Sequence, residues 1–199
     1  MIEIFLNGGP LMYPILLCSV IGWAIFLERL RTYRKIHKEM LPTLTQVRNS
    51  LIAKEPEKAV AYCRSTSSPL ARILLSVLTA KKNERGYIKE MADEVGSRET
   101  AELQRYLGLL ATIANISPLL GLLGTVLGMI KAFNVIAEAG TGTPATLGGG
   151  ISEALITTAA GLSVAVPLIL VHRYLASRAD RLVLEMEDFT GQIISLFME

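Results

Sequence analysis

The chain has few of the side chains from which soluble catalytic and metal sites are built. Of its 199 residues, two are cysteines, two are histidines and 19% are charged, whereas an average soluble domain carries about 25% charged residues. It contains no CxxC or HExxH string, and Cys18 and Cys63 lie in segments of different character, so we expect neither a metal site nor a disulfide. No glycine-rich string ends in Gly-Lys-Ser/Thr, which excludes that kind of phosphate-binding loop. We expect no cofactor and no covalent catalysis.

A basic excess is also lacking. The chain carries 20 Lys and Arg against 18 Asp and Glu, a formal net charge of +2. Nucleic-acid binding needs a clear positive excess on some face of the molecule. The composition therefore argues against a nucleic-acid partner.

The scarce charges are unevenly distributed, because residues 11–27, 106–130 and 154–171 contain none. A helix that crosses a bilayer core needs about 20 mostly apolar residues. The sequence therefore predicts an all-α membrane protein with three transmembrane helices, at 11–28, 106–133 and 151–175. A buried helix of a soluble protein is the alternative, but such a helix normally keeps a polar stripe facing water.

The positions of the basic residues predict the orientation. Sixteen of the 20 Lys and Arg lie between Arg29 and Arg105, and three more follow the third apolar stretch. By the positive-inside rule, segments 29–105 and 176–199 are cytoplasmic, and segments 1–10 and 134–150 lie on the outer side. The first basic cluster comes after the apolar run and Glu3 comes before it, so the first span is expected to be a retained anchor and not a signal peptide.

Apolar periodicity predicts helices through the cytoplasmic segment, with a break at Ser68-Pro69. From Tyr87 onward no Gly-Pro punctuation precedes the second span, so one continuous long helix is expected there. The third span runs on into an apolar stripe that ends at Phe197. We therefore expect two long helices that extend into a cytoplasmic bundle, and a glycine-rich outer loop that includes residues 148–150.

The polar residues inside the spans are the informative ones, because polar groups in hydrocarbon are costly and usually face a bundle interior or a pore. The second span carries small or hydroxyl side chains at helical spacing, and Thr158 and Gly161 lie on a similar face of the third. Ordinary small-residue packing, with threonines bonded to their own backbone, explains the same pattern. The residues of the second span are Ser117, Pro118, Gly121, Gly124, Thr125 and Gly128.

The strings from Ser117 to Gly128 and from Glu153 to Leu162, followed by Pro167, resemble the signature of the ExbB/TolQ branch of the MotA/TolQ/ExbB family. The resemblance covers essentially the whole chain. It implies a multi-pass inner-membrane protein of a Gram-negative bacterium, with a periplasmic N-terminus and a cytoplasmic C-terminus, that converts the proton-motive force into work on the envelope. It also implies a homopentameric ring around a dimer of an ExbD/TolR-like single-span partner, coupled to a TonB- or TolA-like protein.

In that family the partner's membrane aspartate carries the proton, and Thr125, Thr158 and Glu153 match the family's pore positions. The residues agree with this division of labour, because no span has an ionisable side chain at its middle. Glu153 has two interpretations, one as a cation-attracting entrance and one as a negative charge at a helix N-terminus. We expect Ser117, Pro118, Gly121, Gly124, Gly128, Gly161 and Pro167 to pack or shape the pore wall.

Thr157 departs from the family's pattern, because proton-driven members tend to have alanine immediately before the third-span threonine. A threonine pair at this place is found in related sodium-driven stators, and sodium favours oxygen ligands. Thr157 is therefore a further candidate for the ion pathway. A sodium-driven, flagellar or gliding-type stator subunit is the alternative function, and flagellar members differ in having four spans.

Overall fold

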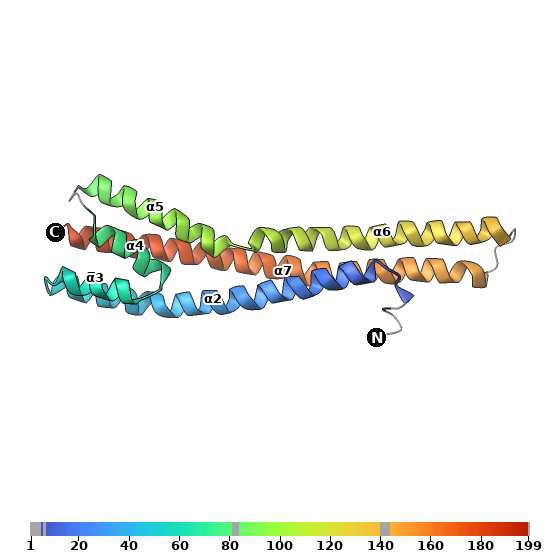
Figure 1. Cartoon of the computed structure of the whole chain (residues 1–199), viewed down its shortest axis with the longest axis horizontal. Coiled ribbons are helices and arrows are strands. Elements are labelled where there is room, and N and C mark those ends of the chain that lie inside the picture. The colour runs from blue at the N-terminus through green and yellow to red at the C-terminus, as the bar shows by residue number, and fades with distance from the viewer. Residues whose placement is uncertain (1–4, 6, 81–83, 140–143, 199) are drawn as a thin grey trace. The chain divides into compact units, whose positions relative to one another are not determined.

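The computed structural model describes residues 5, 7–80, 84–139 and 144–198, and every regular element in this part of the chain is a helix. Figure 1 shows α2 (Met12–Ile52), α3 (Pro56–Ser65), α4 (Pro69–Leu78), α5 (Arg85–Gln104), α6 (Leu107–Ala139) and α7 (Pro144–Phe197). Within these described ranges, three helical runs are long and apolar enough to cross a membrane, and each contains most or all of one charge-free stretch. The prediction of an all-α protein with three spans is confirmed.

The chain divides into two compact units. The first, which we call the membrane unit, comprises Met1–Leu27 and Tyr106–Tyr174. The second, the charged unit, comprises Glu28–Arg105 and Leu175–Glu199. The division follows the charge pattern of the sequence, because all three charge-free stretches fall in the membrane unit.

In the membrane unit, α6 and α7 lie side by side along most of the length of α6 (Figure 1). The first part of α2 packs on α7, where Gly22 lies directly against the Leu168 side chain. Large apolar side chains cover the outer faces, including Leu119, Phe133 and Leu170, which are 61%, 61% and 65% exposed. An apolar surface of this kind is a liability in water and suits a hydrocarbon environment.

In the charged unit, the apolar stripes of the helices form a common core. The predicted break at Ser68-Pro69 is confirmed, because α3 ends at Ser65 and α4 begins at Pro69. The apolar stripe predicted along the end of α7 is confirmed, because residues spaced three to four apart along it are buried. Buried members of this core include Tyr33, Met40, Val47, Cys63, Leu70, Leu74, Val77, Ile88, Leu103, Leu175, Ala179, Leu182, Met186 and Ile193.

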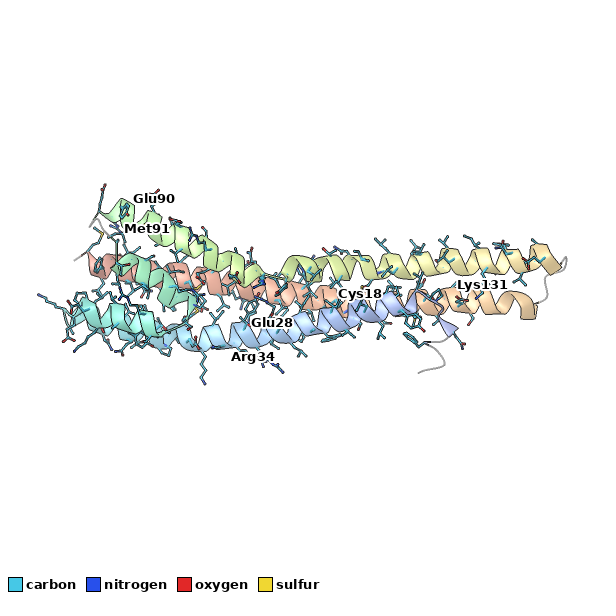
Figure 2. All side chains as sticks on the ribbon, in the orientation of Figure 1. Cys18, Glu28, Arg34, Glu90, Met91 and Lys131 are labelled. Carbon is cyan, nitrogen blue, oxygen red and sulfur yellow. The ribbon has the colours of Figure 1, made fainter. Side chains whose placement is uncertain are left out.

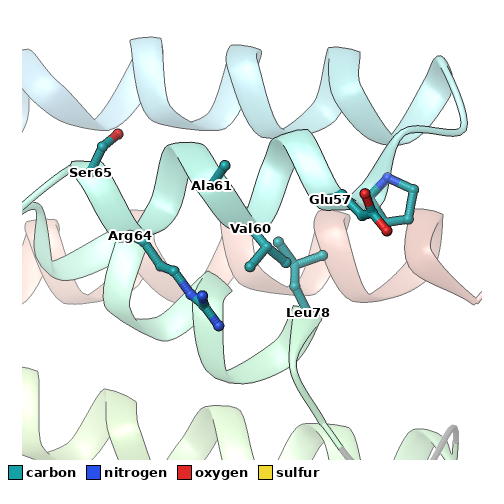
Figure 3. Close-up of a pocket in the computed structure, with 7 residues that line it drawn as sticks. Glu57, Val60, Ala61, Arg64, Ser65 and Leu78 are labelled. Atoms are coloured by element: carbon teal, nitrogen blue, oxygen red, sulfur yellow. The ribbon is translucent and has the colours of Figure 1, made fainter.

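The surface of the charged unit has a hollow between α3 and α4 (Figure 3). Val60, Ala61 and Leu78 give it an apolar base, and Glu57 and Arg64 lie among its polar lining residues.

The charged unit also has a buried cysteine, Cys63 of α3. Burial raises the pKa of its thiol to about 11.

The prediction of one continuous helix from Tyr87 into the second span is wrong at one point. A short break divides this segment into two helices. α5 ends at Gln104, α6 begins at Leu107, and Tyr106 between them has a φ of +66°. A non-glycine residue in this left-handed region interrupts the ladder of backbone hydrogen bonds. The continuous long helices are therefore α2, with 41 residues, and α7, with 54.

The outer connection is shorter than predicted. α6 extends to Ala139 and α7 begins at Pro144, so the helices reach into the 134–150 segment from both sides. Gly148–150, predicted as loop, are helical. Glycine is a poor helix former in isolation, and the contact of Gly150 with α6 described below shows why it is helical here. Residues 140–143 of the predicted loop lie outside the described residues.

Candidate functional site

The two principal span helices meet along a line of small residues, which we call the α6–α7 seam: Gly121, Gly124, Gly128, Gly150, Ala154 and Gly161. A Cβ at Gly121 would lie 3.1 Å from the Thr158 Cα, and a Cβ at Gly128 would lie 2.8 Å from the Gly150 carbonyl oxygen. The nearest atoms at Gly121 are all backbone, and those at Gly128 are the Gly150 carbonyl oxygen with the Cβ and Cα of Ala154, so no flexible side chain can move aside. The prediction that small residues allow a close approach of these spans is confirmed.

The seam continues at both ends of the contact. A Cβ at Gly161 would lie 2.6 Å from the Ser117 carbonyl oxygen, and a Cβ at Gly150 would lie 2.8 Å from the Gly128 carbonyl oxygen. Because later residues of α7 meet earlier residues of α6, the two helices are antiparallel. Ser117 is itself fully buried, and its hydroxyl donates to the Ile113 carbonyl one turn earlier at 2.8 Å.

Thr158 bridges the two helices. Its hydroxyl donates to the carbonyl oxygen of Gly121 on α6 at 2.7 Å. Thr125 lies four residues after Gly121, about 6 Å further along α6 at 1.5 Å per residue. Its hydroxyl donates to the Leu122 carbonyl at 2.6 Å, and both threonines are partly exposed. The structure therefore places these two hydroxyls on the same stretch of the helix pair, at its partly open edge.

Thr157 lies in a different environment, although it is the next residue in the chain. It is 1% exposed, and its side chain fills the space beside Gly124. Its Oγ1 lies 2.6 Å from the Gly8 carbonyl oxygen and 2.8 Å from that of Glu153, so the hydroxyl is held between the N-terminal turn and its own helix. Successive helical residues point about 100° apart, and this rotation separates Thr157 from Thr158.

Glu153 forms an ion pair across the helix pair. Lys131 Nζ of α6 lies 2.6 Å from Glu153 Oε2, and the two side chains are 65% and 20% exposed. Figure 2 labels Lys131 near one end of α6. The backbone of Gly9, at a φ of +71°, packs directly on the Glu153 carboxylate. Glycine is the residue that adopts this conformation readily, and it has no side chain to displace the carboxylate.

The position of Glu153 argues against one of its two predicted interpretations. α7 begins at Pro144, nine residues earlier, and its first turn contains no acidic residue. The effect of the helix dipole on a charge falls off within the first turn. Its charge is instead paired with Lys131. This pairing was not predicted from the sequence, although Lys131 is the only Lys or Arg between Arg105 and Arg173 and so was the evident candidate.

Pro118 and Pro167 both lie inside helices that continue past them. Each lacks the N–H that would bond to the carbonyl four residues earlier. For Pro118 that carbonyl belongs to Ala114, and for Pro167 it belongs to Ser163. Transmembrane helices tolerate such prolines when nearby groups or local adjustments satisfy the freed carbonyl.

Two polar arrangements in the charged unit were not predicted from the sequence. Tyr33 Oη donates to the Leu103 carbonyl at 2.7 Å, and an Arg29 guanidinium nitrogen donates to the Glu102 carbonyl at 3.0 Å. These carbonyls lie in the last turn of α5, where the regular ladder of helical hydrogen bonds ends, and Glu102 also accepts from the Arg105 N–H at 3.3 Å. Burial raises the pKa of Tyr33, and the charge of Arg29 acts in the opposite direction. These α2 side chains thus satisfy the end of α5.

The second arrangement is the ion pair of Arg72 with Glu99. Arg72 Nε donates to Glu99 Oε1 at 2.6 Å, and a second guanidinium nitrogen contacts Oε2, so the pair is bidentate. Glu99 is buried, and its hydrogen bonds raise the pKa of Arg72. Bidentate guanidinium–carboxylate pairs are strong and directional. The pair joins α4 to α5.

Among the described residues, no group of three or more His, Cys, Asp and Glu side chains is placed to hold a metal ion. The membrane unit instead carries serine and threonine hydroxyls on a close-packed helix pair, with an ion pair near one end of the pair. These features define a helical membrane protein with three spans and a hydroxyl-bearing contact between the second and third.

Comparison with known proteins gives the family. The sequence model of the MotA/TolQ/ExbB proton channel family matches residues 65–188, more than half of the chain. The chain belongs to this family, whose members are membrane proton channels.

Several individual relatives agree with this assignment. The chain is 32% identical to the biopolymer transport protein ExbB of Salmonella typhimurium over 196 residues, covering 93% of this chain and 79% of the relative. It is 30% identical to a putative ExbB homolog of Methanothermobacter thermautotrophicus over 180 residues, covering 90% of this chain and 64% of that one. It therefore spans less than two thirds of that relative's length. The Tol-Pal system protein TolQ of Pseudomonas aeruginosa is 40% identical over 87 residues, covering 44% of this chain and 38% of TolQ.

Proposed function

We propose that this chain is the ring-forming subunit of an ion-driven motor in the bacterial inner membrane, with its N-terminus in the periplasm and its C-terminus in the cytoplasm. It acts with an ExbD/TolR-like single-span partner to convert the proton-motive force into mechanical work on the envelope. The observation that carries the proposal is the pair of partly exposed hydroxyls, Thr125 and Thr158, on the α6–α7 contact of a chain in the proton channel family.

The need for a partner follows from charge. Residues 107–130 of α6 and 154–171 of α7 contain no Asp, Glu, Lys, Arg or His. Hydroxyl groups can guide a proton but cannot store its charge, so a titratable carrier has to come from another chain. Moving one elementary charge down a membrane potential supplies about 2.3 kcal/mol per 100 mV. A membrane carboxylate on the partner, facing Thr125 and Thr158, is the carrier that this arrangement fits.

Five copies of the chain around a partner dimer would place these threonines on the inner wall of a ring. Hydrogen bonds from a hydroxyl-lined wall lower the cost of the charged carboxylate in a dry environment. Glu153 and Lys131 stand near the outer ends of the same helices, and we assign them to the entrance. The partner in the outer compartment is a TonB-like or a TolA-like protein.

The test uses single substitutions that remove a hydroxyl and retain side-chain shape. Thr125→Val and Thr158→Val are expected to abolish energy-dependent function when they replace the chromosomal copy, while the complex keeps its native mass in detergent. Thr158→Ser should retain function because it restores the hydroxyl. The matched control is Thr112→Val, which removes an exposed hydroxyl of α6 that bonds only one turn back along its own helix. Full activity in both Thr125→Val and Thr158→Val would refute the proposal.

Thr157 separates the proton from the sodium alternative. Its hydroxyl is buried against Gly8 while that of Thr158 points to α6, so the two do not form a shared oxygen site. We therefore assign Thr157 to anchoring the N-terminal turn, and we assign the ion as a proton. Thr157→Val should lower the thermal midpoint, because it leaves the Gly8 carbonyl without this donor, at a cost of about 1–3 kcal/mol. Work measured at fixed membrane potential should not depend on sodium, and a requirement for sodium would reverse both assignments.

The partner and the machine are identified by purification. The full chain, isolated from its own host in mild detergent, should retain a small single-span protein with one aspartate inside its span. A native mass that corresponds to five copies of this chain and two of the partner is the expected stoichiometry. The periplasmic domain of the co-purifying protein then distinguishes a Ton-type from a Tol-type system. Recovery of the chain without such a protein, in complexes that still function, would contradict the role of the partner.

A further inference from the structure

One surface of the charged unit carries a concentrated positive charge. Arg31, Arg34, Lys35 and Lys38 lie on α2 at positions i, i+3, i+4 and i+7. At 100° per residue these four side chains fall within an arc of about 100° on one helix face. All four are exposed, and Figure 2 shows Arg34 projecting from the α2 ribbon into open space. We call these four residues the basic face of α2.

Nearby carboxylates leave most of this charge uncompensated. Glu28 is engaged by Arg29 at 2.7 Å and by the Thr32 hydroxyl at 3.2 Å. Glu39 lies 3.9 Å from Lys35, at the outer limit of an ion pair. Within the described part of the chain, no carboxylate lies within 4 Å of Arg31, Arg34 or Lys38. Among the described residues, the carboxylate of Glu39 is therefore the one partner of these four positive charges, and it lies at a long distance from Lys35.

The basic face begins immediately beyond the first span. Leu27 is the last residue of the charge-free stretch, and α2 continues through this point without interruption. At 1.5 Å per residue, the four Cα atoms lie about 6 to 16 Å further along the helix. The headgroup region occupies about 5–8 Å on each side of the hydrocarbon core, and a surface potential extends a further Debye length of about 8–10 Å. Long Lys and Arg side chains reach back toward this layer.

We propose that the basic face of α2 binds the phosphate groups of anionic phospholipids in the adjacent leaflet. Three features together favour this occupant: the four cationic side chains share one face, of which only Lys35 has a carboxylate within 4 Å among the described residues, all four are exposed, and they follow the first span directly. The guanidinium groups of Arg31 and Arg34 suit bidentate phosphate contacts, and the two lysines add flexible charges. The site is separate from Thr125 and Thr158, so it does not depend on the proposed ion pathway.

The chain contains its own probe for this site. Trp23 is the only tryptophan, is 43% exposed, and lies on α2 eight residues before Arg31, about 12 Å along the helix. The full chain is reconstituted into bilayers that contain brominated phosphatidylglycerol or brominated phosphatidylcholine at matched fractions. Bromine quenches tryptophan fluorescence on contact, so the ratio of the two quenching curves gives the preference for the anionic lipid. We expect a preference of at least fivefold at low salt.

The test variant is Arg31→Gln/Arg34→Gln/Lys35→Gln/Lys38→Gln, which removes the face and retains polar side chains. Each base near a charged membrane surface is worth about fivefold in affinity, so this variant should bind the two lipids equally. The matched control is Arg48→Gln/Lys54→Gln/Lys58→Gln/Arg64→Gln, which removes the same charge from four exposed residues of the charged unit. It should retain the wild-type preference.

Four results would overturn the proposal. Equal quenching by both lipids in the wild-type chain, or the same loss in the control variant, would show that the four residues form no site. Displacement of the brominated anionic lipid by millimolar inorganic phosphate would show a general anion site. Absence of quenching by either lipid would show that protein and not lipid covers this face of α2.

Discussion

Gly161 of α7 lies so close to the carbonyl oxygen of Ser117 on α6 that a Cβ at position 161 would be 2.6 Å from that oxygen. The neighbouring atoms at 3.0 and 3.1 Å are the Cα and N of Gly121. Gly161→Ala therefore has to push the two helices apart. We expect it to lower stability by about 1–3 kcal/mol, the usual cost of overpacking, as a lower thermal midpoint in detergent.

Gly108→Ala is the matched control for this prediction. Gly108 is a helical glycine of the same membrane unit, and a Cβ there would meet no atom within 4 Å. Alanine is favoured over glycine in a helix by about 0.5–1 kcal/mol. The control should be neutral or slightly stabilising. An unchanged midpoint for Gly161→Ala would show that the seam is looser than its geometry indicates.

Tyr33→Phe tests whether the hydrogen bond from the Tyr33 hydroxyl to the Leu103 carbonyl stabilises the end of α5. The change removes only the hydroxyl that donates to the Leu103 carbonyl, at a position that is 4% exposed. A buried carbonyl left without its donor costs about 1–3 kcal/mol. We expect a lower denaturation midpoint and faster amide hydrogen exchange in the last turn of α5. Tyr62→Phe, at a partly exposed residue of α3, should change neither quantity.

The Arg72–Glu99 pair is best tested by a double-mutant cycle. Glu99→Met leaves the guanidinium without its bidentate partner, and Arg72→Met leaves a buried carboxylate. Because half of the Arg72 side chain is exposed, water screens part of the loss. We expect each single change to cost about 2 kcal/mol, below the range for fully buried pairs. The double change should cost less than the sum, and additive losses would show that the pair contributes no coupling.

The raised pKa of Cys63 predicts that the stability of the fold declines at alkaline pH. Burial raises the pKa of its thiol to about 11, so folding favours the protonated form. This contribution to stability is complete below the unfolded pKa near 8.5–9 and declines as the pH rises toward 11. In a Cys18→Ala background, alkylation by iodoacetamide should be slow at pH 8 and rise about tenfold per unit up to pH 10. A rate that levels off near pH 9 would contradict the raised pKa.

Much of the fold was predictable because the membrane imposes a simple pattern on sequence. The three charge-free stretches predicted the spans, and the spacing of Gly121, Gly124 and Gly128 predicted the close approach of the second span to the third. Both signals are local, since each is contained within one helix.

The features that could not be predicted depend on tertiary contacts. The two residues of the break, Arg105 and Tyr106, include no Gly or Pro, and the nearby carbonyls of Glu102 and Leu103 accept from Arg29 and Tyr33, which lie 73 and 70 residues away in the chain. The anchoring of the Thr157 hydroxyl likewise depends on Gly8, whose carbonyl approaches α7 only in the folded chain. Sequence spacing placed both threonines in one span and gave no indication of which neighbour each hydroxyl would reach.

The hydrogen bond from the Thr158 hydroxyl to the Gly121 carbonyl can break without leaving that carbonyl unpaired. Gly121 lies inside α6, so its carbonyl oxygen has a helical N–H donor as well as the threonine hydroxyl. Under the proposed function, a rotation of the Thr158 side chain that turns the hydroxyl toward a proton carrier therefore leaves no backbone group unsatisfied. In that proposed cycle, the hydroxyl is released and recaptured while the helix pair itself stays intact.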